Sequence, residues 1–210
     1  MPEKDFIKGL KKQTDNKFLN MYAADAVDNN GKGFQYYFAT RREEGDLMCQ
    51  TGELKADGVA IYAVLKDEPD KLIMVRQYRY PINDFIYELP AGLVDRGETA
   101  REAALRELKE ETGYELELFT DYPEYLDRPY IQSQGMSDEC DIFVYGFAEG
   151  TPSVDGNEAT EEIEVKVVDK EEAKRILREE KVTVRAYTML INFINSVPEN
   201  PFGFLRMEAK

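Results

Sequence analysis

One helix with a signal at each end constrains this 210-residue chain more than any other feature. Thr99-Ala-Arg-Glu102 fits a capping box, in which the threonine hydroxyl accepts a backbone N–H and the glutamate carboxylate reaches back. Good helix formers continue to Thr112, and Gly113 stands where a left-handed residue commonly ends a helix. The sequence therefore predicts a helix over residues 99–112.

Three glutamates of this helix share one narrow face. At about 100° per residue, Glu110 lies roughly −60° and Glu111 roughly +40° from Glu107. Two such charges about 4 Å apart cost roughly 4 kcal/mol at an effective dielectric of 20. One interpretation is a solvated face with ion pairs. The other is a site for a hard divalent cation, and Mg²⁺ or Mn²⁺ suits oxygen-only ligands that leave room for water and phosphate.

The small and apolar residues of the helix predict how it packs. Ala104, Leu105 and Leu108 adjoin the carboxylates, and we expect them to anchor the helix against a sheet. Ala100 and Ala103 lie beside the carboxylates, where small side chains would leave room for a ligand to approach.

Strand and turn signals surround this helix. Asn29-Asn-Gly-Lys-Gly33 predicts a hairpin turn between strands at 18–27 and 34–40. Apolar runs predict further strands at 58–65, 72–78, 142–147 and 163–168, and helical patterns cover 170–178 and 184–194. We expect an α/β fold with a mixed sheet between helices. An antiparallel β extension over 1–55, a main domain over 56–198 and a C-terminal tail over 199–210 complete the predicted organisation.

Composition excludes several classes of function. With 42 acidic and 27 basic residues the net charge is −15, which argues against binding nucleic acid or an anionic membrane surface. The absence of histidine excludes a Ser-His-Asp triad and any His-ligated metal. Cys49 and Cys140 are too far apart for a zinc-site spacing, and no apolar run approaches the roughly 20 residues of a membrane span. These features predict a cytoplasmic protein.

The acidic helix belongs to a longer pattern. The stretch Gly92-x5-Glu98-x7-Arg106-Glu107-Leu108-x-Glu110-Glu111-x-Gly113 matches all seven strict positions of the Nudix box. A chance match in a chain of this length is on the order of one in a million at average composition. The final box position is usually aliphatic and is Tyr114 here. The chain therefore resembles the Nudix hydrolases over most of residues 56–195.

The resemblance implies a fold, a reaction and roles for the box residues. The Nudix fold is a mixed sheet between helices, and the activity is Mg²⁺-dependent hydrolysis of a nucleoside diphosphate linked to another moiety, with Mn²⁺ as a possible substitute. The implied metal ligands are Glu107, Glu110 and Glu111. Arg106 would orient one of them, and Glu98 would act as a supporting acid. The implied role of Gly92 and Gly97 is to let the loop turn tightly near the phosphates, and an ordinary turn with no such role is the alternative.

The flanks of the box resemble the ADP-ribose and nucleotide-sugar pyrophosphatases, on the segments Val75–Pro81 and Tyr87–Gly92. In that group the arginine and glutamine of the first segment hold substrate, which implies this role for Arg76, Gln77 and Arg79. The implied substrate-side residues of the second segment are Glu88, near the metals, and Gly92, and the backbone carbonyl of Ala91 is an implied metal ligand. We expect Arg76 and Arg79 to share one strand face and to supply positive charge, although a solvated strand face is the alternative.

Ser133-Gln-Gly-Met-Ser-Asp-Glu139 resembles a Ser-Pro-Gly-x-x-x-Glu loop of the same group. The resemblance implies that Glu139 is the general base, with Asp138 as the second candidate. Gln134 replaces the usual proline, and the loop begins about five residues later than is usual in that group. Members often exchange an N-terminal β subdomain across a homodimer, with an aromatic residue stacked on adenine. Tyr22, Phe34, Tyr36 and Tyr37 are available for that contact, and a core role is equally open.

Three hypotheses follow. The first is a pyrophosphatase that converts ADP-ribose or a related nucleoside diphosphate sugar to AMP and a sugar phosphate. GDP-mannose, NADH and dinucleoside polyphosphates are alternative substrates. The second is a catalytically silent nucleotide-binding regulator of the same fold. The third, a Ca²⁺-binding module, has little support because no loop resembles Asp-x-Asp-x-Asp-Gly. The expected partners are a small nucleotide substrate and a second copy of the chain.

Overall fold

The computed structural model describes residues 6–157 and 159–206. The chain divides into two compact units. The first consists of Met1–Asp57 and Pro129–Asp141, and the second of Gly58–Arg128 and Ile142–Lys210. The second unit contains the whole predicted box, and the first contains the predicted loop with Glu139.

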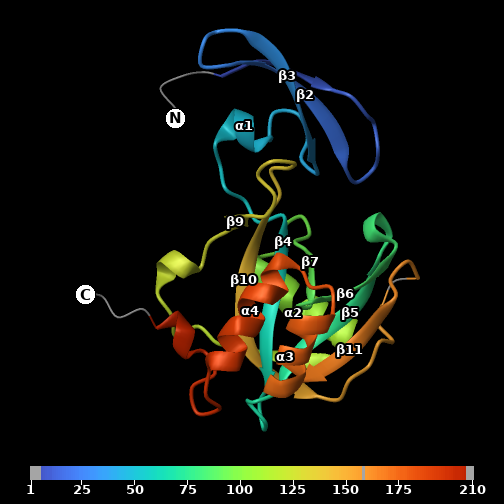
Figure 1. Ribbon diagram of the computed structural model, residues 1–210, viewed down its shortest axis with the longest axis vertical. Helices are drawn as coiled ribbons and strands as arrows, with labels where there is room; N and C mark the ends of the chain where they lie inside the picture. The colour runs from blue at the N-terminus through green and yellow to red at the C-terminus, as the bar shows by residue number, and fades with distance from the viewer. Residues whose placement is uncertain (1–5, 158, 207–210) are drawn as a thin grey trace. The chain divides into compact units, whose positions relative to one another are not determined.

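The first unit is built on a three-stranded antiparallel sheet (Figure 1). Its elements are β1 (Ile7–Lys12), β2 (Asn20–Val27), β3 (Gly33–Thr40), α1 (Met48–Thr51) and β9 (Tyr130–Ile131). The predicted hairpin is confirmed, because β2 pairs with β3 and Gly31 takes a left-handed φ of 81° in the turn. The sequence analysis did not predict β1, which has no buried residue and no apolar pattern of its own, and which is defined by its pairing with β2.

The second unit holds most of a larger sheet of order β11-β5-β4-β10-β8, to which β6, β7 and β9 add short pairings. Its strands are β4 (Gly58–Leu65), β5 (Leu72–Arg79), β6 (Asp84–Glu88), β7 (Ala91–Leu93), β8 (Tyr114–Leu118), β10 (Cys140–Gly150) and β11 (Ile163–Val168). The helices are η1 (Tyr80–Ile82), α2 (Ala100–Thr112), η2 (Glu124–Leu126), α3 (Lys170–Glu179), α4 (Val184–Asn195) and η3 (Gly203–Leu205).

The sheet is mixed, as expected. β4 and β10 run in the same direction. The backbone N–H of Asp57 donates to the carbonyl of Cys140 at one end of the pair, and that of Lys66 donates to the carbonyl of Ala148 at the other. The pairs β4–β5, β5–β6, β5–β11 and β8–β10 are antiparallel. A strand with neighbours and helices on both faces is buried throughout, and β4 is buried from Gly58 to Val64.

Helices cover both faces of this sheet (Figure 1). Ala60, Tyr62 and Val64 of β4 belong to one core cluster with residues of α3 and α4. α2 packs against β4 and β7 but contributes no residue to that cluster, since it lies on the opposite face. The predicted α/β arrangement of a sheet between helices is therefore confirmed.

The chain after α4 returns to the core. Phe202 is 1% exposed and stacks on Phe119, with ring centroids 4.3 Å apart. Leu205 is also buried in the same cluster. Within the described residues, no helix has both the length and the apolar character needed to span a membrane.

Candidate active site

The acidic helix α2 is capped as the sequence predicts. The N–H of Glu102 donates to Thr99 Oγ1 at 3.3 Å, and the N–H of Thr99 donates to Glu102 Oε2 at 2.8 Å. Gly113 ends the helix with a φ of 78°. A side chain at Gly113 would also collide with the loop at Ser153, because an ideal Cβ would lie 2.5 Å from its backbone nitrogen.

The packing face of α2 differs in part from the prediction. Ala104 and Leu108 are fully buried as expected, but Leu105 is 38% exposed and does not anchor the helix. Leu105 lies about 160° around the helix from Glu107, beyond the edge of the buried face. Of the two alanines expected to leave room for a ligand, Ala103 is fully buried and Ala100 is partly exposed.

Arg106 binds three carboxylates, where the sequence analysis expected it to orient one. Its Nε and one terminal nitrogen donate to the two oxygens of Glu98 at 3.0 and 2.9 Å. The other terminal nitrogen donates to Glu107 at 2.7 Å and to Glu110 at 3.1 Å. The bonds from Arg106 hold the pKa of Glu98 below its ordinary value. Arg106 therefore joins the loop before α2 to two of the predicted metal ligands.

The position of Glu107 explains why the first residue of the box, Gly92, must be a glycine. Its side chain is 14% exposed, and burial raises the pKa of its carboxyl. An ideal Cβ on Gly92 would lie 1.9 Å from Glu107 Cδ, so only glycine admits this carboxylate. Of the two glycines expected to allow a backbone turn, Gly97 has a left-handed φ of 89°. Gly92 has no positive φ, and its role is to allow the close approach of a side chain.

Glu111 is the most buried of the three helix glutamates, at 3% exposed. Its Oε2 accepts the backbone N–H of Ala91 at 3.0 Å, which links α2 to β7 beside the predicted carbonyl ligand. Burial raises the pKa of Glu111 well above its ordinary value, and the charges of Glu107 and Glu161 act in the same direction. Glu110 is the exposed member, with a side chain 46% accessible.

The arginines predicted to bind substrate lie on opposite faces of β5, so the expectation that they share a face is wrong. Residues three apart on a strand point to opposite sides, since side chains alternate with a period of two. Arg79 donates to both oxygens of the buried Glu88, at 2.6 and 3.1 Å. Arg76 lies 4.2 Å above the Phe85 ring and pairs with Glu164 at 2.8 Å. Gln77, on the face of Arg79, is 6% exposed.

Sequence reasoning missed one acid of this cluster. Glu161 precedes β11, and its charge acts on Glu107, Glu111 and Arg79. The antiparallel register of β11 against β5 places Ile163 opposite Gln77, and the N–H of Tyr78 donates to the Glu162 carbonyl at 3.0 Å. An acid just before the predicted strand at 163–168 was the available signal, but only the strand pairing shows which residues it approaches.

The first unit holds the two candidates for the general base. Glu139 accepts Arg41 Nε at 3.1 Å, and Asp138 Oδ2 accepts the backbone N–H of Met48 at 3.1 Å. The remaining predicted site residues lie in the second unit. Of the aromatic candidates for base stacking, Tyr22 is 1% exposed and stacks on Phe38. The others, Phe34, Tyr36 and Tyr37, are exposed on β3.

Comparison with known proteins identifies the family. The model of the NUDIX domain matches residues 55–190, which is more than half of the chain. The chain belongs to the NUDIX domain family. The resemblance stated from the box residues is thereby confirmed, and α2 with the loop before it is the box of a NUDIX domain.

Similar proteins carry related names. A Caenorhabditis elegans protein named putative nudix hydrolase 2 is 36% identical over 70% of this chain and 62% of its own length. The Saccharomyces cerevisiae ADP-ribose pyrophosphatase is 34% identical over 57% of this chain and 50% of its own length. The chain thus spans about half to three-fifths of these relatives. A crystal structure of an ADP compounds hydrolase has a TM-score of 0.60 and 19% identity over 82% of each chain, which supports the fold.

The donor set of this NUDIX domain fits a divalent cation in chemistry and charge. Glu107 and Glu111 are desolvated carboxylates that repel one another, and positive charge beside them would relieve that repulsion. Their oxygens, with those of Glu110 and the Ala91 carbonyl, are the hard ligands that Mg²⁺ prefers. Among the described residues, no three acidic or cysteine side chains converge closely enough to form a ready ligand set. The argument for a cation therefore rests on the negative charge of these glutamates and not on a ready-made arrangement of their oxygen atoms.

Proposed function

We propose that this chain hydrolyses the diphosphate bond of ADP-ribose or a related nucleoside diphosphate sugar with the aid of Mg²⁺. The observation that carries the proposal is the buried carboxylate of Glu111 beside the partly buried carboxylate of Glu107, within a complete box. Their charge is costly to bury and is of little use to the fold alone, whereas a cation that binds a diphosphate would require it. The names of the similar proteins, which include a mouse ADP-sugar pyrophosphatase that is 31% identical, support this class of substrate.

In the proposed mechanism Glu107, Glu110, Glu111 and the carbonyl of Ala91 would hold the cation. When bound, it would supply positive charge to the phosphate oxygens. Arg106 and Gly92 keep Glu107 in place, and the N–H of Ala91 does the same for Glu111. Arg79, with a side chain 42% exposed, can donate to a phosphate oxygen while Glu88 fixes its orientation. From the resemblance alone, we retain Glu139 as the general base that takes the proton of the attacking water.

Arg76 has a different proposed contribution from Arg79. Its guanidinium is stacked on Phe85 and paired with Glu164 on the other strand face. We therefore assign phosphate binding to Arg79 and retain substrate contact by Arg76 and Gln77 as predictions from the resemblance alone. Variants Arg79→Lys and Arg76→Lys separate the two roles, because only the former should raise KM for a diphosphate substrate by about tenfold.

The test is a substrate panel on purified protein with Mg²⁺, in which AMP or another nucleotide product is followed by chromatography. ADP-ribose, ADP-glucose, GDP-mannose, NADH and diadenosine polyphosphates cover the alternatives. Glu111→Gln is the control variant, since the amide can still accept the N–H of Ala91, and its kcat should fall at least about a hundredfold. No turnover of any substrate, with tight binding of ADP-ribose by calorimetry, would instead support the nucleotide-binding regulator.

The assembly and location also remain proposals. We propose a homodimer that uses the first sheet, because Phe34 and Tyr36, which share one face of β3, expose 48% and 43% of their surfaces. Light scattering coupled to size exclusion should give twice the chain mass, and the variant Phe34→Asp should shift it toward that of the monomer. A cytoplasmic location stays a prediction for cell fractionation.

A further inference from the structure

The loop at residues 133–139 is bonded to the first sheet at successive positions. The hydroxyl of Tyr36 donates to the Gly135 carbonyl at 2.8 Å, and the N–H of Ala39 donates to the Met136 carbonyl at 2.8 Å. Ala39 and Ser137 then form a parallel bridge. The end of β3 therefore acts as a partner strand for this loop, which has no regular structure of its own between β9 and β10.

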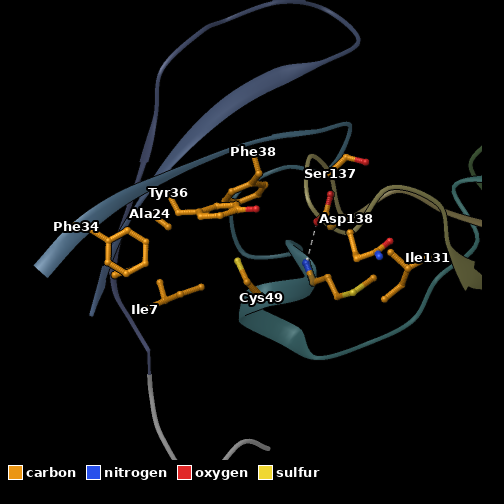
Figure 2. Close-up of a pocket in the computed structure, with 12 residues that line it drawn as sticks. Ile7, Ala24, Phe34, Tyr36, Phe38, Cys49, Ile131, Ser137 and Asp138 are labelled. Carbon is orange, nitrogen blue, oxygen red and sulfur yellow. Dashed lines mark hydrogen bonds between the residues drawn. The ribbon is translucent and has the colours of Figure 1, made fainter. Parts of the chain in front are cut away.

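Asp138 is held on the inner side of the loop. It lines a largely apolar cavity of about 390 Å³ together with Phe38 of β3, Cys49 of α1 and Ile131 of β9. Figure 2 shows the Asp138 side chain at the end of this cavity, with the dashed bond from the backbone of Met48. Since that carboxylate lines the cavity and accepts a backbone N–H from the residue that begins α1, it serves as an anchor for the loop.

The end of the loop is fixed by an ion pair with little exposure to solvent. Arg42 donates to both oxygens of Asp57, at 3.1 and 2.9 Å, and the two side chains are 5% and 13% exposed. Asp57 in turn accepts the N–H of Cys140 at 2.8 Å and donates its own N–H to the Cys140 carbonyl at 2.7 Å. Both neighbours of Glu139 in the sequence, Asp138 and Cys140, are therefore bonded in place.

The Glu139 side chain has its own partner in the same sheet unit. Arg41, the residue before the buried Arg42, donates from Nε to Glu139 Oε1 at 3.1 Å, and each side chain is 36% exposed. No hydrogen-bond partner of Oε2 is found in the part of the chain that the structure describes, so this oxygen is available to accept a proton. An ion pair exposed to this extent adds little to stability, because solvent screens it. Its effect on side-chain orientation is a separate matter.

We propose that Arg41 is a positioning residue for Glu139, and that one function of the N-terminal sheet is to template the loop that carries this general base. The inference rests on the proposed function, in which Glu139 removes the proton of the attacking water. Arg41 acts through Glu139 and needs no contact with substrate. A misplacement of a catalytic group by about 1 Å can cost up to a hundredfold in rate, so the loss of this bond should appear in kcat.

The test is a double-mutant cycle on the full chain with the best substrate of the panel. Glu139→Gln should lower kcat about a hundredfold, and Arg41→Ala about tenfold with KM within a factor of two. Arg41→Lys, which retains a donor, should recover most of the loss. In the Glu139→Gln background, Arg41→Ala should have no further effect on kcat, because its route to the reaction is already removed. Lys12→Ala breaks exposed ion pairs with Asp15 and Glu43 in the same unit and should leave kcat unchanged.

Three results would overturn the inference. The first is a wild-type kcat in Arg41→Ala, and the second is an equal loss from Arg41→Ala in both backgrounds, which indicates a structural effect independent of Glu139. The third is a rise in KM without a fall in kcat, which indicates contact with substrate. Melting curves within about 2 °C of wild type establish that the variants are folded. A wild-type protein that turns over no substrate refutes the proposed function and this inference together, whereas the three results above leave the proposed function standing.

Discussion

Replacing Gly92 by alanine tests the argument that glycine is required there by a side chain and not by the backbone. The ideal Cβ lies 1.9 Å from Glu107 Cδ, whereas ordinary contact begins at 3.4 Å. The carboxylate must therefore move by about 1.5 Å, the difference between these distances. It is the mobile end of a side chain, so the fold can accommodate the change, but its 2.7 Å bond to Arg106 is lost.

The expected cost in stability is modest. Insertion of a methyl group into a packed site costs about 1–3 kcal/mol, and relaxation of Glu107 places Gly92→Ala at the lower end of that range. At roughly 2–4 °C per kcal/mol for a chain of this size, Tm should fall by about 2–8 °C. The cost in activity is larger, because a displacement of about 1 Å at a catalytic group is worth about a hundredfold in kcat.

The matched control is Gly31→Ala in the turn between β2 and β3. Gly31 has a φ of 81° and nothing within 4 Å of an added Cβ, so alanine there introduces backbone strain of about 1–2 kcal/mol without contact to the box. Both variants should melt a few degrees below wild type, and only Gly92→Ala should lose activity. If the kcat of Gly92→Ala stays within threefold of the control, the proposed link between Gly92, Glu107 and turnover is refuted.

Three further variants test separate parts of the structure. In chelator, Glu111→Gln should melt no lower than wild type by calorimetry, because the amide removes the cost of a buried charge; a lower Tm would show that the charge stabilises the fold. Arg106→Lys should lower kcat about tenfold or more, since an ammonium cannot bond Glu98 twice while holding Glu107 and Glu110, and unchanged kinetics would argue against this network. Asp169→Ala removes the cap of α3, where Asp169 accepts the Glu172 N–H at 2.8 Å, and should cost about 1 kcal/mol in urea unfolding at unchanged activity. That bond lowers the pKa of Asp169. The bond therefore stabilises the folded protein fully above the pKa of the unfolded state, and this stabilisation is lost as pH falls through the lower pKa of the folded state. If Asp169→Ala still lowers the free energy of unfolding at about pH 2, the assignment is contradicted.

Local signals predicted the elements that local interactions define. The capping box at Thr99 and the left-handed Gly113 were readable because each depends on residues within one helical turn. The strand runs at 58–65 and 163–168 have their observed bounds. The first is a continuous apolar run because β4 is buried on both faces, whereas the second alternates apolar with polar residues at its start, as a partly exposed strand at the end of the sheet order does. In contrast, the exposure of Leu105 depends on where the sheet ends beside α2, which the helix sequence does not contain.

The parts of the site that sequence could not predict are those set by contacts between distant segments. Glu161 approaches Glu107 and Glu111 only through the register of β11 on β5. The bond of Arg41 to Glu139 spans 98 positions in the sequence. The error over Arg76 and Arg79 is different, because their odd spacing on a strand already places them on opposite faces.

The structure gives most strict positions of the box a contact that does not require substrate. Glu98 accepts a hydrogen bond from Arg106, eight positions later in the chain, and Gly92 leaves space for the Glu107 carboxylate. Gly113 ends the helix in contact with the loop at Ser153. The strict positions of the box therefore include residues that hold the predicted metal-ligand carboxylates in place, in addition to those carboxylates. Substitutions of the supporting residues act through Glu107 and its neighbours, so their effects on kcat should not add when they are combined, since each removes the same placement of one carboxylate.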